Sequence, residues 1–140
     1  MTRLALSLAL LPCLALADGY GSARVTEVTS IYDGDTFRAN IADWPPIVGE
    51  RIKVRINGID SPELRARCDN EKRQARAAKQ WLVAKLRSAD VIELRHMERG
   101  KYFRIVADVY ADGESVGQEM IEQGLAVRYD GGTKHNPWCE

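Results

Sequence analysis

Residues 51–63 read RIKVRINGIDSPE, and apolar and polar side chains alternate along the first nine of them. Ile52, Val54 and Ile56 therefore fall on one face, and Arg55 lies on the opposite, polar face. Because successive side chains of a β-strand point to opposite faces, this pattern predicts a strand with one buried face. Asp60 follows directly, so a carboxylate is expected where this strand leaves the sheet.

Two pairs of further segments have the composition of β-strands. Residues 25–32 are rich in β-branched side chains and are followed by residues 36–41, which together predict a hairpin. The turn between them, residues 33–35, reads Asp-Gly-Asp, a sequence that suits a tight turn because glycine accepts positive φ and aspartate stabilises turns. Residues 91–97 and 103–110 predict two more strands.

Helical periodicity is clearest over residues 70–87. Small and apolar side chains fall there on one stripe, with Trp81 beside it; the stripe consists of Ala75, Ala78, Leu82 and Leu86. A shorter helix is predicted over 116–123, where Gly124 fits a C-terminal cap. Five strands with a helix between the third and the fourth are typical of an OB-type barrel. We therefore predict a five-stranded OB-type β-barrel with helices, an α+β fold, although periodicity does not determine the strand order.

The composition is that of one globular domain with one core. The chain has 140 residues, 45% of which are apolar. Lysine and arginine number 20, and so do aspartate and glutamate. This balance gives no sign of tight nonspecific binding to nucleic acid, so attraction to a polyanion would require a local basic cluster or a metal ion.

The first residues have the pattern of a secretory signal peptide. Arg3 precedes an apolar run over residues 4–16, and a small-x-small pattern suited to signal peptidase ends at Ala17. The run is short for a membrane span, which takes roughly 20 residues. We predict a signal peptide over 1–17 and a single exported domain over 18–140, periplasmic or extracellular and without stable membrane association.

Removal of the signal peptide would leave two cysteines, Cys68 and Cys139. An even number of cysteines in an oxidising compartment favours a disulfide over two free thiols. In the loop-entropy model, closing a loop of this size contributes roughly 4 kcal/mol. Neither His96 nor His135 has partners at the spacing of metal ligands, so the sequence does not support a histidine-based zinc site.

Carboxylates are expected at the ends of two predicted strands. Asp35 follows the turn glycine, and Asp60 follows the third strand. If these strands pair, the two carboxylates converge, and with a backbone carbonyl they would form an open oxygen site for a hard divalent cation. Taken alone, Asp-Gly-Asp is weak evidence for such a site, because most tripeptides of this kind are simply turns.

Three more residues have the chemistry that phosphodiester hydrolysis requires. Glu63 could orient or deprotonate an attacking water. Arg55 and Arg104 carry guanidinium groups, which match phosphate oxygens in pairs and keep their charge. Each of these side chains could also serve in an ordinary salt bridge or a solvated surface.

Together, five segments make the sequence resemble the thermonuclease, or staphylococcal nuclease-like, family. The matching segments are residues 31–36, 54–63, 101–104, 110–113 and 123–126. They occur in family order between residue 25 and about residue 129, which covers most of the predicted mature chain. The most specific piece is Asp-Ser-Pro-Glu preceded by Arg55.

This resemblance implies an OB-type barrel and Ca²⁺-dependent cleavage of DNA and RNA. The implied calcium ligands are the carboxylates of Asp35 and Asp60 and the backbone carbonyl of Ser61. The implied catalytic residues are Glu63 for the attacking water and Arg55 and Arg104 for the phosphate. The implied substrate contacts are Lys101, Tyr102 and Tyr129. We therefore predict a secreted, monomeric, Ca²⁺-dependent endonuclease that acts on nucleic acid.

The sequence also departs from the family pattern. Phe103 replaces the usual glycine before Arg104, which could alter the loop that places this arginine. After Tyr129 there is no pattern for the family's long final helix, and we expect a bridge between Cys68 and Cys139 to anchor this segment instead. Two alternatives stay open: a noncatalytic OB-type module that binds nucleic acid or protein, and a structural calcium protein.

Overall fold

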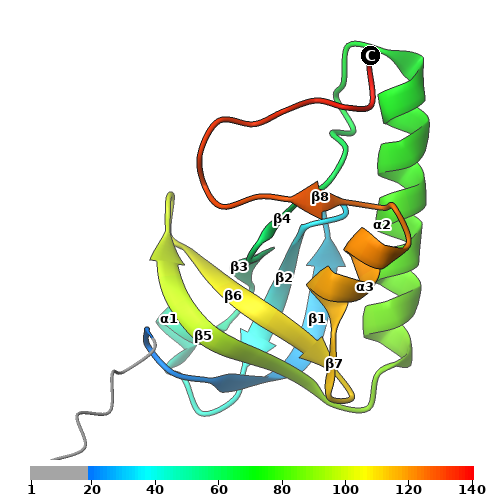
Figure 1. Cartoon of the computed structure of the whole chain (residues 1–140). Helices are drawn as coiled ribbons and strands as arrows, with labels where there is room; N and C mark the ends of the chain where they lie inside the picture. The colour runs from blue at the N-terminus through cyan, green and yellow to red at the C-terminus, as the bar shows by residue number, and fades with distance from the viewer. Residues whose placement is uncertain (1–18) are drawn as a thin grey trace, which may run out of the picture.

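The barrel is formed by five strands, which are drawn in Figure 1. The computed structural model describes residues 19–140, so the predicted signal peptide over 1–17 lies outside the described residues. The barrel strands are β1 (Ala23–Ile31), β2 (Thr36–Ile41), β3 (Ile52–Ile56), β5 (Ile92–Gly100) and β6 (Arg104–Ala111). Three short strands complete the β-structure: β4 (Ile59–Asp60), β7 (Glu114–Ser115) and β8 (Val127–Arg128). The helices of this region are α1 (Pro46–Gly49), α2 (Asp69–Ser88) and α3 (Val116–Glu122).

A parallel pairing closes the barrel. The strand order is β3-β2-β1-β5-β6, and β3 pairs again with β6, with Val54 opposite Ile105 and Arg55 opposite Val106. The other barrel pairings are antiparallel. This closed, mixed, five-stranded barrel confirms the predicted OB-type fold.

The predicted third strand is divided by a turn. It ends at Ile56, and Gly58 then turns the chain with a φ of +76°, which glycine adopts without the steric cost of a side chain. The next two residues form β4, which leaves the barrel and pairs with β8. Asp60 is therefore held against Val127 of the C-terminal region rather than within the barrel sheet.

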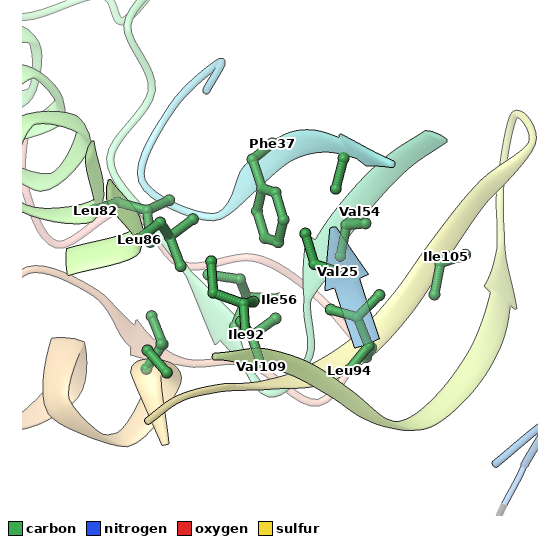
Figure 2. Close-up of a cluster of buried hydrophobic side chains, with 14 of the residues drawn as sticks. Val25, Phe37, Val54, Ile56, Leu82, Leu86, Ile92, Leu94, Ile105 and Val109 are labelled. Carbon is green, nitrogen blue, oxygen red and sulfur yellow. The ribbon is translucent and has the colours of Figure 1, made fainter. Parts of the chain in front are cut away.

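The core lies between the barrel strands and one face of α2. Figure 2 shows Leu82 and Leu86 of the helix in one buried cluster with barrel side chains such as Phe37, Val54 and Leu94. All four residues of the predicted helical stripe are buried, which confirms that prediction. None of the helices in residues 19–140 combines the length and the apolar character needed to cross a membrane.

The turn between β1 and β2 touches α2 at Gly34. Its φ lies outside the left-handed region, so the prediction that glycine is needed here for positive φ is wrong. A Cβ at this position would lie 2.8 Å from the Cβ of Ala78 and 2.9 Å from the Cβ of Ser61. Glycine is required because the turn, the helix and the segment after β4 meet here without room for a side chain.

We expect Gly34→Ala to destabilise the protein by about 1–3 kcal/mol, which is typical of overpacking a tight contact. The measurement is the free energy of unfolding from urea denaturation. Gly117→Ala is the matched control, because a Cβ there meets its nearest neighbour, Ile56, at an ordinary 3.4 Å. This control lies in α3, where alanine is favoured over glycine, so it should not lose stability. Equal stability of Gly34→Ala and the wild type would contradict the steric explanation.

Candidate active site

Asp35 and Asp60, the two predicted metal ligands, are both buried and lie close together. Asp35 precedes β2, and its carbonyl accepts a hydrogen bond from the backbone N–H of Ile56 at 2.8 Å. Its carboxylate accepts from the backbone N–H of Ser61 at 3.0 Å and from the hydroxyl of Thr36 at 2.8 Å. The β2–β3 pairing places Asp35 beside Arg55, and β4 brings Asp60 to the same guanidinium, so the two carboxylates converge as the sequence implied.

Arg55 lies between the two carboxylates. One guanidinium nitrogen is 3.6 Å from Asp35 Oδ2, and the other is 3.3 Å from Asp60 Oδ1. The guanidinium also donates to the carbonyl of Ile59 at 3.0 Å. Only 8% of the residue is exposed, so this is a buried, charge-assisted network rather than a surface ion pair.

The carboxylates of this region repel one another. Burial, and then the neighbouring charge of Asp35, raises the pKa of Asp33 to about 7. Glu63 adds to this repulsion. A divalent cation held by oxygens of Asp35 and Asp60, beside the guanidinium of Arg55, would offset the excess negative charge, and the available donors are oxygens, as hard cations prefer. The residues present therefore fit a calcium ion.

Ser61 lies at the floor of the same region. It is 1% exposed, and its hydroxyl is a buried polar atom with no hydrogen-bond partner among the described residues. The hydroxyl lies at the tight contact with Gly34, whereas the backbone N–H of Ser61 is the group that donates to Asp35. The predicted role of the Ser61 carbonyl as a metal ligand stays a prediction.

Glu63 is half-exposed and reaches the site from the segment after β4. Its Oε1 lies 3.6 Å from the ammonium of Lys134, which lies 2.7 Å from Asp60 Oδ1. Burial lowers the pKa of Lys134, but its hydrogen bond to Asp60 and the charges of Asp60 and Glu63 raise this pKa by more. The sequence interpretation missed Lys134 because no periodicity or motif marks it within the C-terminal segment.

Glu71, which the sequence interpretation also missed, fixes the backbone of Glu63 in place. It is 2% exposed in the first turn of α2, and its Oε1 accepts a hydrogen bond from the backbone N–H of Glu63 at 3.0 Å. Its Oε2 accepts from the side-chain amide of Asn136 at 2.9 Å. In the sequence, the only local indication of this role is that Glu71 is an acidic residue in the first turn of a helix. Such residues are usually explained by their favourable interaction with the helix dipole.

The predicted disulfide between Cys68 and Cys139 is present, with 5.8 Å between the two Cα atoms. Cys68 caps the N-terminus of α2, and Asn70 donates to the carbonyl of Trp138 at 2.8 Å. In Figure 1 the segment after β8 loops outward and returns to this end of the helix. The bridge thus anchors the C-terminal segment beside the carboxylates, as expected from the sequence.

Tyr129 lies between two cations. The guanidinium of Arg55 and the ammonium of Lys134 are each 5.6 Å from the centroid of its ring, a distance suited to cation–π attraction. Together with Asp60, the ring lines a cleft of about 720 Å³, and the other lining residues of the C-terminal segment are Val127, Arg128, Asp130, Gly132, Thr133 and His135. The cleft opens directly beside the proposed metal ligands.

The three remaining predicted residues lie apart from this cluster. Arg104 is the first residue of β6, where its backbone lies opposite Lys53 of β3. Its side chain lines a different, mainly apolar pocket of about 360 Å³. Its Nε is buried and unpaired within residues 19–140, where no contact joins Arg104 to Asp35 or Asp60. Lys101 and Tyr102 lie at the exposed tip of the β5–β6 hairpin.

The backbone at the hairpin tip explains why the family usually has glycine where this chain has Phe103. Tyr102 and Phe103 have φ angles of +56° and +59°, in the left-handed region. This conformation is unfavourable for a bulky side chain, whereas glycine adopts it freely. Phe103 is 76% exposed, so its ring gains little burial in return.

Comparison with known proteins agrees with this geometry. The family described as "Staphylococcal nuclease homologue" matches residues 53–137. A protein of Emericella nidulans named "Probable endonuclease lcl3" is 33% identical over 132 residues, which cover 74% of this chain and 47% of the relative. A protein of the same name from Aspergillus terreus is 31% identical over 84% of this chain and 49% of its own length.

The chain is also similar to an uncharacterized 38.1 kDa protein of Capnoides sempervirens, at 31% identity over 76% of this chain and 32% of that protein. The chain thus spans about half, or less, of the length of the curated relatives it matches. The profile match covers β3, β4, α2 and the C-terminal segment, the elements that carry Arg55, Asp60 and Glu63. With this match and the closed barrel, the chain belongs to the staphylococcal nuclease family.

Proposed function

We propose that this protein is an exported, calcium-dependent nuclease that hydrolyses phosphodiester bonds of DNA, RNA or both. The observation that carries the proposal is the buried guanidinium of Arg55 between the carboxylates of Asp35 and Asp60, with Glu63 at the open side. This arrangement combines a cation site, a phosphate-binding group and a base. A noncatalytic OB-type module would not need all three.

The cation would be held by the carboxylates of Asp35 and Asp60 and by the backbone carbonyl of Ser61. When bound, calcium would neutralise charge on the phosphate as the transition state forms. Few protein ligands leave room for water and for a phosphate oxygen, which suits an ion with flexible coordination.

The chain's own residues would perform the other steps. Glu63 is exposed enough to meet water and would orient it and accept its proton. Arg55 would bind oxygens of the same phosphate. The family resemblance also assigns Arg104 to the phosphate, and for this its side chain would have to turn out of the separate pocket that it lines here. Lys101 and Tyr102 would contact the substrate backbone further along, and Tyr129 would stack near a base.

Export is part of the proposal. The signal-peptide pattern over 1–17 supports it, and so does the disulfide, since such bonds persist in oxidising compartments. We propose a monomer, periplasmic or extracellular, without stable membrane association.

The test is a cleavage assay on duplex and single-stranded DNA and on RNA. We expect cleavage with CaCl₂, loss of cleavage with a chelator, and little activity with MgCl₂ alone, because Mg²⁺ demands a more regular octahedral site. Binding without cleavage under all conditions would favour the noncatalytic module. Calcium binding with neither cleavage nor nucleic-acid binding would favour a structural calcium protein. Equal turnover with Mg²⁺ alone would contradict the metal assignment.

A further inference from the structure

Lys134 lies beside the acidic residues of the proposed site. Its ammonium is 2.7 Å from Asp60 and 3.6 Å from Glu63, the proposed ligand and the proposed base. It also lies 5.6 Å from the ring centroid of Tyr129, which borders the cleft. Lys134 is not part of the cleft lining, but its side chain is 49% exposed and its neighbours Asp60 and Tyr129 both line the cleft.

Lys134 lies in a segment that is held in place both before and after it in the sequence. Before it, the backbone N–H of Tyr129 donates to the carbonyl of Gly58 at 2.9 Å. After it, Asn136 donates to the buried carboxylate of Glu71, and the disulfide at Cys139 ties the segment to α2. An ordinary exposed lysine on a free tail would lose far more conformational freedom on reaching the same place.

The charges of the site indicate what Lys134 does when the cation is bound. Without metal, it offsets part of the negative charge of Asp60 and Glu63. A divalent cation on Asp60 would weaken the attraction that holds the ammonium there. The nearest new anion would then be the phosphate of the incoming nucleic acid, which lysine binds as a mobile point charge.

We propose that Lys134 is a further substrate-binding residue, which contacts a phosphate of the nucleic-acid strand in the cleft beside Asp60 and Tyr129. This inference rests on the proposed function of the same site. It adds a basic contact from the disulfide-anchored C-terminal segment to those of Arg55 and Arg104.

The test measures binding of a single-stranded phosphorothioate DNA oligonucleotide in CaCl₂ over a range of KCl concentrations. Loss of one phosphate contact should reduce the slope of log affinity against log salt by about 0.7 and weaken binding about fivefold near 0.1 M salt. We expect both effects for Lys134→Gln, and a slope close to wild type for Lys134→Arg, which keeps the charge. Lys79→Gln, which removes the same charge from the surface of α2, should match the wild type.

An unchanged slope and affinity in Lys134→Gln would overturn the inference while leaving the proposed function intact. If the calcium affinity of that variant, measured by calorimetry, also rose, Lys134 would be only a counterion that the metal displaces. Failure of the wild type itself to bind the oligonucleotide in CaCl₂ would instead overturn the proposed function.

Discussion

Glu63→Gln is expected to lower the rate of phosphodiester cleavage by roughly 100- to 10,000-fold, the usual contribution of a positioned general base. The amide keeps the shape of the side chain but cannot accept the proton of the attacking water. Because the residue does not bind the phosphate itself in our proposal, substrate affinity should change little, so the effect should fall on kcat. Single-turnover cleavage and oligonucleotide binding, both in CaCl₂, separate these two quantities.

The structure indicates that this substitution leaves the fold intact. The side chain of Glu63 is 55% exposed, and Glu71 holds its backbone N–H rather than its carboxylate. We therefore expect the free energy of unfolding to change by no more than about 0.5 kcal/mol. Glu50→Gln, an exposed acid in the segment between α1 and β3, is the matched control and should cleave at the wild-type rate. A folded Glu63→Gln variant with near wild-type kcat would place the base elsewhere.

Arg55→Met is expected to destabilise the calcium-free protein by about 3–5 kcal/mol, because it leaves the buried carboxylate of Asp35 without a cation and that of Asp60 with Lys134 alone. Asp35 and Asp60 have side chains only 9% and 7% exposed, so water cannot replace the guanidinium. Calcium should recover part of this loss, since it would supply positive charge to the same carboxylates. Urea denaturation in CaCl₂ and in chelator measures both effects.

Arg55→Lys tests the second role of this side chain. A lysine could keep the charge between the carboxylates, but it cannot reproduce the two-pronged guanidinium contact with a phosphate. We expect turnover to fall roughly 100- to 1,000-fold, the cost of one preorganised donor. Arg38→Lys, an exposed arginine on β2 that donates to the carbonyl of Arg51, is the control and should keep wild-type turnover. Wild-type cleavage by Arg55→Lys would remove this residue from the chemistry.

Local patterns determined the elements of this protein. Alternation along 51–59 revealed the strand and its buried face, and the stripe from Ala75 to Leu86 revealed the face of α2 that packs on the barrel. The even count of cysteines in the predicted mature chain was enough to predict the Cys68–Cys139 bridge. These features depend on periods of a few residues or on composition, which a sequence displays directly.

The tertiary structure alone decided which distant residues share the site. Lys134 lies 74 positions from Asp60, and Asn136 lies 65 positions from Glu71. No local period connects such residues, because their contacts follow from the β4–β8 pairing and from the disulfide. Closure through the parallel β3–β6 pairing is a similar case: strands of the right composition can pair in several orders, and packing of the whole core selects one.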